Sequence, residues 1–179
     1  QKWDGPKSVQ FFGGEPLLNP RLIIEVCEYF RALQDAGDID SVPDFSIVTN
    51  GVAGDEQMAQ ILHRYSIAPT VSIDGPQPMH DALRGKGTFV RADRFVGMCR
   101  EQGVEVDFEC TWTPQHIQRG ISVVDLIDFF HDRYDKRVLH VAPVSATPAS
   151  ELYLDPSARQ EAYAEAARYS VRTMAEGEL

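Results

Sequence analysis

Short apolar segments alternate with longer segments whose apolar residues recur at helical spacing along most of the chain. Segments of the first kind are typical of buried strands, and segments of the second kind are typical of amphipathic helices. The pattern predicts strands at residues 9–12, 45–48, 70–73, 104–111 and 137–141. It predicts helices from Pro20 toward Gly37, from Met58 to Tyr65, from Thr88 to Gly103, from Ile121 to Phe130 and from Pro156 to about Glu176.

Start and stop residues support several of these boundaries. Asn19-Pro20 places a capping side chain directly before a proline in the first helical turn, and Asp155-Pro156 starts the last predicted helix. A glycine at position 37 is expected to end the first helix. Between residues 76 and 87 the composition is polar, and we expect a long loop there.

The fourth predicted strand shows the clearest alternation. Val104, Val106, Phe108 and Cys110 occupy every second position, so they should share one buried face. Pro114 is expected to break this strand.

Five alternations of strand and helix with short connections predict parallel βαβ units and an α/β fold. Five strands are too few to close an eight-stranded barrel, so we expect a partial (β/α) TIM-type barrel. A doubly wound open sheet is the alternative fold. Residues 1–145 would form the barrel core, and residues 146–179 would form a linker and a helix.

Composition narrows the classes of partner. The 179 residues are 43% hydrophobic and 25% charged, which fits a folded domain with a substantial core. The net charge of −10 is spread along the chain, which disfavours nucleic acid and would suit a basic peptide. We find neither an apolar run of the ~20 residues that a membrane span needs nor a signal peptide, and we expect a cytoplasmic protein.

The three cysteines, Cys27, Cys99 and Cys110, match neither a disulfide framework nor a CxxC metal site. We therefore expect buried, reduced thiols and predict no metal ligand within this chain.

Three successive predicted strands end in polar, glycine-bearing loops: Gly13-Gly14-Glu15-Pro16, Thr49-Asn50-Gly51 and Ser72-Ile73-Asp74-Gly75-Pro76. Ligands bind at the carboxyl ends of strands in parallel α/β folds, so the three loops should meet at one rim. Glycines let the backbone approach a ligand, a glutamate can pair with an ammonium group, and an arginine can clamp a carboxylate. Each loop could also be an ordinary turn, but together they favour a site for a zwitterionic ligand.

These segments resemble a known family. Phe11-Phe12-Gly13-Gly14-Glu15-Pro16-Leu17-Leu18 is similar to the GGEP motif of radical S-adenosylmethionine (SAM) enzymes, and Thr49-Asn50-Gly51 to their TNG motif. The stretch from Val71 to Pro76, with His80-Asp81 and Arg84, resembles the SLDGP…HD..R segment of SPASM-containing maturases. That group includes anaerobic sulfatase-maturating enzymes and enzymes that cross-link ribosomally made peptides, and residues 146–179 would then lead toward a SPASM domain.

The resemblance implies a set of SAM-binding positions. Ser72 would meet the ribose, Asn50 and Asp74 would shape the pocket, and Arg84 would bind the methionine carboxylate. Arg94 is a second candidate for that carboxylate, and Arg84 could instead be an ordinary solvated charge. The positions expected to hold the methionyl end are Gly13, Gly14, Glu15 and Pro16.

Other polar residues receive smaller roles or none. His80 and Asp81 could simply order their loop, and no catalytic residue is predicted. No role is predicted for the remaining histidines, His63, His116, His131 and His140.

The resemblance also implies a 4Fe–4S cluster, held by a CxxxCxxC loop that lies before GGEP in the family. We expect that loop and the first barrel strand to lie outside this sequence, and the ligands of any auxiliary clusters to lie beyond residue 179. Reductive cleavage of SAM would give a 5′-deoxyadenosyl radical that abstracts hydrogen from a peptide side chain, leading to a cross-link or an oxidation. The implied partners are a peptide or protein substrate, with or without a leader peptide, and an external electron donor. Residues 1–179 alone should be inactive.

Two alternatives remain open at this point. One is a non-radical α/β barrel enzyme whose rim loops bind a phosphate or a sugar. The other is a degenerate, non-enzymatic member of the family that binds a peptide.

Overall fold

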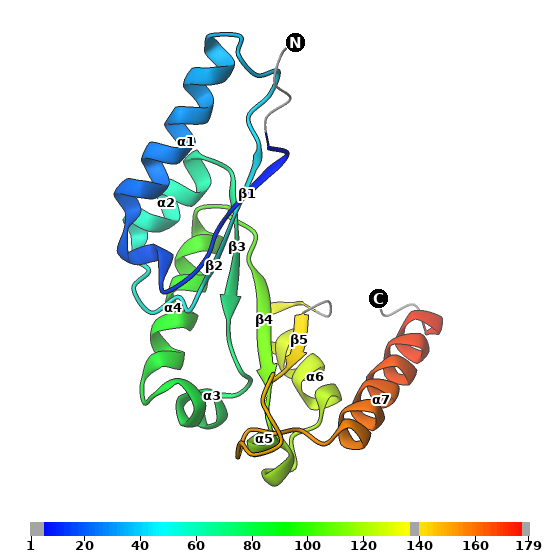
Figure 1. Cartoon of the computed structure of the whole chain (residues 1–179). Coiled ribbons are helices and arrows are strands. Elements are labelled where there is room, and N and C mark those ends of the chain that lie inside the picture. The colour runs from blue at the N-terminus through cyan, green and yellow to red at the C-terminus, as the bar shows by residue number, and fades with distance from the viewer. Residues whose placement is uncertain (1–5, 137–139, 177–179) are drawn as a thin grey trace. The chain divides into compact units, whose positions relative to one another are not determined.

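Parallel strand pairing organises both parts of the chain (Figure 1). The computed structural model describes residues 6–136 and 140–176. These form two units, a first from Gln1–Ser72 with Lys86–Asp107 and a second from Ile73–Gly85 with Phe108–Leu179. None of the described helices is both long and apolar enough to span a bilayer.

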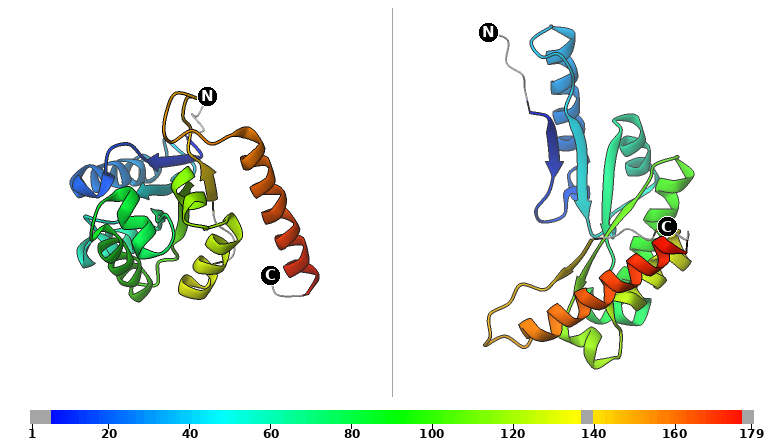
Figure 2. Two further views of the ribbon diagram at one scale, coloured as in Figure 1. Left: turned by 90° about the horizontal axis from the view of Figure 1, so that it is seen from below. Right: turned by 90° about the vertical axis from the view of Figure 1, so that its right-hand side faces the viewer.

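The first unit is a three-stranded parallel sheet with helical crossovers. Strand β1 (Ser8–Phe11) pairs with β2 (Asp44–Thr49), and β2 pairs with β3 (Ile67–Ser72). Helix α1 (Pro20–Asp35) connects the first two strands, and α2 (Glu56–Arg64) connects the second and third. Helix α4 (Thr88–Glu101) packs against α2 (Figure 2). The three strands therefore end on the same side, as parallel order requires.

The helix boundaries in this unit follow the predicted capping residues. Asn19 caps α1, because its Oδ1 accepts a hydrogen bond from the Leu22 N–H at 3.1 Å, and Pro20 occupies the first turn. Gly37 follows the helix with a left-handed φ of +74°. Both signals were readable from the sequence because capping is local.

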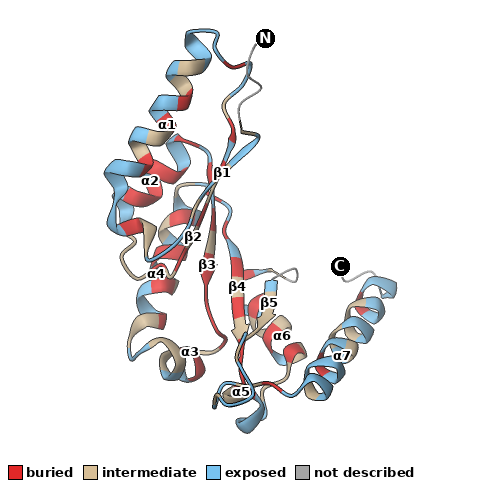
Figure 3. Cartoon of the chain, viewed as in Figure 1, coloured by how far each residue is buried: buried red, intermediate tan, exposed pale blue. Residues whose placement is uncertain are grey.

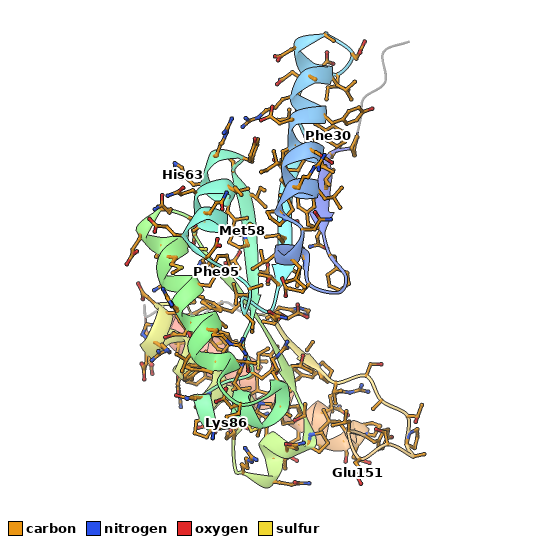
Figure 4. All side chains as sticks on the ribbon, turned by 90° about the vertical axis from the view of Figure 1, so that its left-hand side faces the viewer. Phe30, Met58, His63, Lys86, Phe95 and Glu151 are labelled. Atoms are coloured by element: carbon orange, nitrogen blue, oxygen red, sulfur yellow. The ribbon has the colours of Figure 1, made fainter. Side chains whose placement is uncertain are left out.

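The core of the first unit forms where the helices meet the sheet (Figure 3). Met58 and Phe95, labelled in Figure 4, are buried in α2 and α4. Gly54 lies so close to Phe95 that an added Cβ would come within 2.2 Å of the ring. Each large apolar side chain buried in this way contributes about 1.5–3 kcal/mol of transfer free energy.

The second unit joins two parallel strands with four helices. Strand β4 (Asp107–Trp112) pairs with β5 (His140–Pro143). The helices are α3 (Gln77–Arg84), α5 (Pro114–Gln118), α6 (Val123–Tyr134) and α7 (Pro156–Ala175). Phe108, Phe130 and Tyr134 form an aromatic cluster between β4 and α6. Helix α7 packs on α6, and the Tyr169 hydroxyl donates a hydrogen bond to Asp128.

The fourth strand begins later than its alternation predicted. Val104 and Val106 are buried as expected, but the strand starts at Asp107. The reason is that the Val104 N–H bonds to the Cys99 carbonyl at 2.9 Å and completes the C-terminal cap of α4. A backbone donor used in a helix cap is not available to a strand ladder.

Two short α-helices were not predicted. Residues 77–84, expected to lie in a loop, form α3, in which proline occupies the first turn. Residues 114–118 form α5, which also begins at a proline. The predicted strand at 137–141 falls partly on residues 137–139, which lie outside the described residues, and β5 itself begins at His140. The predicted division at residue 145 stays a prediction.

Candidate cofactor-binding site

The loop after β1 exposes its backbone. Gly13 and Gly14 have left-handed φ values of +96° and +56°, a region that side-chain-bearing residues rarely adopt. An added Cβ at either position would meet nothing within 4 Å. The space beside this backbone is therefore open, which is the condition for a ligand to approach it closely.

Glu15 links this loop to the loop after β2. Its Oε1 accepts hydrogen bonds from the Leu17 N–H at 3.0 Å and from the Thr49 hydroxyl at 2.5 Å. Its Oε2 accepts from the Asn50 N–H at 2.9 Å. A carboxylate offers about four acceptor positions, so about one remains, on Oε2. The sequence indicated a ligand-binding glutamate, but it gave no sign of this bridge across 35 residues.

The side chains of Thr49 and Asn50 complete the turn. The Thr49 oxygen accepts from the Gly51 N–H at 2.9 Å, and Asn50 Oδ1 accepts from the Val52 N–H at 2.8 Å. Within the described part of the chain, the NH₂ group of Asn50 forms no hydrogen bond. Gly51 has a further reason to lack a side chain, because an added Cβ would lie 3.2 Å from Ala92 Cα.

Ser72 ends β3 and is buried, with 9% of its surface exposed. Among the residues that the structure describes, its hydroxyl has no hydrogen-bond partner. The oxygen of this hydroxyl still reaches solvent, so it is available to hydrogen-bond a polar ligand group.

In the second unit, Asp74 is the centre of a buried polar network. Its carboxylate accepts from Arg84 Nε at 2.5 Å, from Arg84 Nη2 at 3.1 Å and from the Thr111 N–H at 2.8 Å. Asp74 is 2% exposed, so these bonds form in a poorly solvated environment. Arg84 is thus tied to Asp74 and is not an isolated surface charge.

Two buried histidines hold the backbone of Asp74. The Asp74 N–H donates to His80 Nδ1 at 3.1 Å. His116 Nδ1 accepts from the Thr113 N–H at 3.0 Å, so its proton resides on Nε2, which donates to the Asp74 carbonyl at 3.1 Å. Burial lowers the pKa of both imidazoles and favours their neutral forms. His116 received no predicted role; the local signal for it was a Thr-Pro-x-His sequence that forms a capping box.

Arg94 and two histidines without a predicted role lie on the surface. Arg94, the second carboxylate candidate, is exposed on α4. His63, labelled in Figure 4, and His140 are exposed.

The three cysteines are buried and free, as predicted. Burial raises the pKa of Cys27 to about 11, that of Cys99 to about 12 and that of Cys110 well above its usual value. Raised pKa values favour the protonated thiols at neutral pH. Across residues 6–136 and 140–176, no group of three His, Cys, Asp or Glu residues is placed to hold a metal ion. The described residues do not fit a 4Fe–4S cluster, whereas the open glycines, Glu15 and Ser72 fit a polar ligand.

The fold and these loops define a class of protein. The structure resembles native anSMEcpe with bound AdoMet, with a TM-score of 0.76 and 22% identity over 95% of this chain and 48% of that one. It also resembles SuiB of Streptococcus suis bound to S-adenosylmethionine, with a TM-score of 0.63 and 18% identity over 92% of this chain and 37% of that one. The chain thus has the predicted α/β fold, a partial (β/α) TIM-type barrel with parallel strands.

The family model for the radical SAM superfamily matches residues 1–133. The chain belongs to the radical SAM superfamily, as its motifs indicated. Membership supports an enzyme and implies SAM and a 4Fe–4S cluster as cofactors.

Curated relatives add further similarity. An uncharacterized protein of Methanothermobacter thermautotrophicus is 30% identical over 145 residues, which are 76% of this chain and 50% of that protein. The cysteine-type anaerobic sulfatase-maturating enzyme of Clostridium perfringens is 30% identical over 115 residues, 62% of this chain and 30% of the enzyme. The Fe-coproporphyrin III synthase of Methanosarcina barkeri is 30% identical over 126 residues, 69% of this chain and 29% of the synthase. The chain spans half or less of the length of these relatives.

Proposed function

We propose that the whole protein is a radical SAM maturase that removes hydrogen from a side chain of a peptide or protein, leading to a cross-link or an oxidation. The observation that carries the SAM-binding part is the Glu15 bridge, which fixes a carboxylate beside the open backbone of Gly13 and Gly14. The similarity to anaerobic sulfatase-maturating enzymes supports the choice of a peptide substrate.

In this proposal the loops of the first unit bind the methionyl ammonium and the ribose of SAM. The remaining acceptor position on Glu15 takes the methionyl ammonium, while Gly13, Gly14 and Pro16 let the backbone approach it. The unpartnered hydroxyl of Ser72 meets the ribose. The NH₂ group of Asn50 adds a donor to the pocket.

Asp74 and Arg84 have linked roles. Two of the five N–H donors of the Arg84 guanidinium bond to Asp74, and the others remain for a ligand carboxylate. We assign the methionine carboxylate to Arg84, with Asp74 fixing its orientation. Arg94 is the weaker candidate because no described contact orients it.

The cluster with SAM would supply a 5′-deoxyadenosyl radical as the hydrogen-abstracting group. Residues of this chain would bind and orient SAM. We propose that the whole protein also provides the cluster ligands, receives electrons from an external donor and holds any auxiliary 4Fe–4S clusters. The inactivity of residues 1–179 alone and the cytoplasmic location stay predictions.

A second candidate function is a radical SAM enzyme that acts on a non-peptide substrate. The similarity to Fe-coproporphyrin III synthase favours this second candidate. The chain is 30% identical to that synthase over 126 residues and 30% identical to the sulfatase-maturating enzyme over 115 residues. Superfamily membership argues against the non-radical phosphate- or sugar-binding alternative.

The test uses the whole protein, reconstituted anaerobically with iron and sulfide and given SAM and a reductant. We expect 5′-deoxyadenosine by mass spectrometry, and we expect its formation to be lost in Glu15→Ala. Glu25→Ala is the matched control, because Glu25 is exposed on α1 and, among the described residues, pairs only with Arg21. A cluster-loaded protein that forms no 5′-deoxyadenosine would instead indicate the degenerate, non-enzymatic member.

The substrate class is tested in the same assay. A cysteine-containing peptide that accelerates 5′-deoxyadenosine formation, while coproporphyrin does not, would support the maturase. The opposite result would favour the second candidate.

A further inference from the structure

A groove in the second unit lies outside the SAM-binding residues. It has a volume of about 350 Å³. One wall carries Trp112, Ile117 and Ile121, from the end of β4 and from the segment around α5. The other wall is the first half of α7, which contributes Ala162, Glu161 and Glu165. The groove therefore combines an apolar wall with an acidic one.

The apolar wall is partly open to solvent. Ile117 is 46% exposed, whereas Trp112 is 4% exposed. Exposed large aliphatic side chains beside a cavity gain free energy when a partner covers them.

The acidic wall faces no cation within the groove. Glu161 and Glu165 are one turn apart on α7, and like charges at this spacing destabilise a helix. Neither carboxylate forms an ion pair or a side-chain hydrogen bond within the described part of the chain. Among the described residues no Lys, Arg or His lines the groove, although Glu165 also lines a neighbouring cavity that contains Arg168 and Arg172. A cation between the two carboxylates would relieve their repulsion.

We propose that this groove binds a peptide segment in which an apolar residue adjoins a lysine or an arginine. The volume is more than twice the ~150 Å³ cavity that accommodates benzene, so it has room for one apolar side chain and the stem of a cationic one. The apolar side chain contacts Ile117, and the cation lies between Glu161 and Glu165. The choice of a peptide as the ligand rests on the proposed function.

The test measures binding to the whole protein without SAM or reductant. Three fluorescein-labelled, end-capped peptides serve as probes: Gly-Ser-Leu-Arg-Ser-Gly, the same peptide with Gln in place of Arg, and the same peptide with Ser in place of Leu. Fluorescence anisotropy should show that the Leu-Arg peptide binds about tenfold more tightly than the other two at low salt, and this preference should shrink as salt is raised.

Variants locate the binding surface. The double variant Glu161→Gln with Glu165→Gln should bind the Leu-Arg peptide only as well as the Leu-Gln peptide. Glu151→Gln is the control, and it should leave the preference intact because it removes one exposed carboxylate that does not line the groove. The reversal Glu161→Lys with Glu165→Lys should bind a Leu-Glu peptide in preference to the Leu-Arg peptide. Circular dichroism checks that each variant is folded.

Equal binding of the three peptides, or a preference that survives the double variant, would overturn the proposal. Self-association in sedimentation that disappears in the double variant would also overturn it, in favour of a second copy of this chain as the occupant. No SAM cleavage is measured here, so failure of this binding test and failure of the proposed function are distinguishable.

Discussion

Arg84 holds Asp74 through two hydrogen bonds, Nε to Oδ2 at 2.5 Å and Nη2 to Oδ1 at 3.1 Å. The Asp74 side chain is 3% exposed and the Arg84 side chain 28% exposed, so solvent screens the pair only weakly. Two-bond pairing of a guanidinium with a carboxylate fixes the orientation of both groups. The loop after β3 therefore has a defined geometry before any ligand arrives.

The first prediction concerns this pair. Asp74→Asn should lower the free energy of unfolding by about 2–3 kcal/mol, because it leaves the cation of Arg84 without its carboxylate. Urea denaturation at pH 7 measures the change. Glu25→Gln breaks the exposed pair with Arg21 and should cost less than about 1 kcal/mol. Equal losses in the two variants would show that the Asp74 pair is energetically ordinary.

The second prediction concerns Thr49, which donates to Glu15 and accepts from the Gly51 N–H. Thr49→Val keeps the shape but removes both bonds, so it should destabilise the protein by about 1–3 kcal/mol and reduce 5′-deoxyadenosine formation. Thr49→Ser keeps the hydroxyl and should retain most of the activity. The bridge would be unimportant for the cofactor if Thr49→Val were destabilised but fully active.

The third prediction separates backbone strain from ligand approach. Gly14→Ala should cost about 1–2 kcal/mol in stability, because alanine is strained at a φ of +56°. It should also weaken SAM binding by the reconstituted protein, since the methyl group would enter the open space beside the loop.

Gly37→Ala is the matched control for this effect. Gly37 also has a left-handed φ, +74°, with open space around it, but it follows α1 away from the three loops. It should show the strain cost with unchanged SAM binding, as measured by calorimetry. Equal loss of binding in both variants would mean that the open space at Gly14 is not used by SAM.

The fourth prediction concerns pH. Burial places the pKa of His80 and of His116 in the folded state below the value of about 6.5 expected in the unfolded chain. Below pH ~6.5 the unfolded state therefore binds more protons, and stability should fall as the pH is lowered, by up to ~1.4 kcal/mol per pH unit for each histidine, until the folded-state pKa is reached.

Urea denaturation between pH 7.5 and 5.5 measures this slope. His116→Gln should make it shallower, because the variant lacks one of the two buried imidazoles. An unchanged slope in His116→Gln would show that His116 is not the titrating group.

The sequence by itself determined the features that depend on neighbours along the chain. Asn19 caps the helix that begins at Pro20, and the last helix begins at Pro156, both as predicted. The alternation through Cys110 gave the buried face of β4 correctly. The GGEP and TNG motifs gave the superfamily, because a loop that binds a ligand through its backbone needs particular residues at fixed spacing.

Only the tertiary structure decided which side chains meet. Glu15 bonds to residues 34 and 35 positions later, and His116 bonds to the Asp74 carbonyl 42 positions earlier. Such contacts depend on strand pairing and helix packing, which no local pattern encodes. The start of β4 was missed for a local reason, because the Val104 N–H completes the C-terminal cap of α4. Local propensity thus gave the elements and their motifs, and long-range packing gave the hydrogen bonds that turn them into a site.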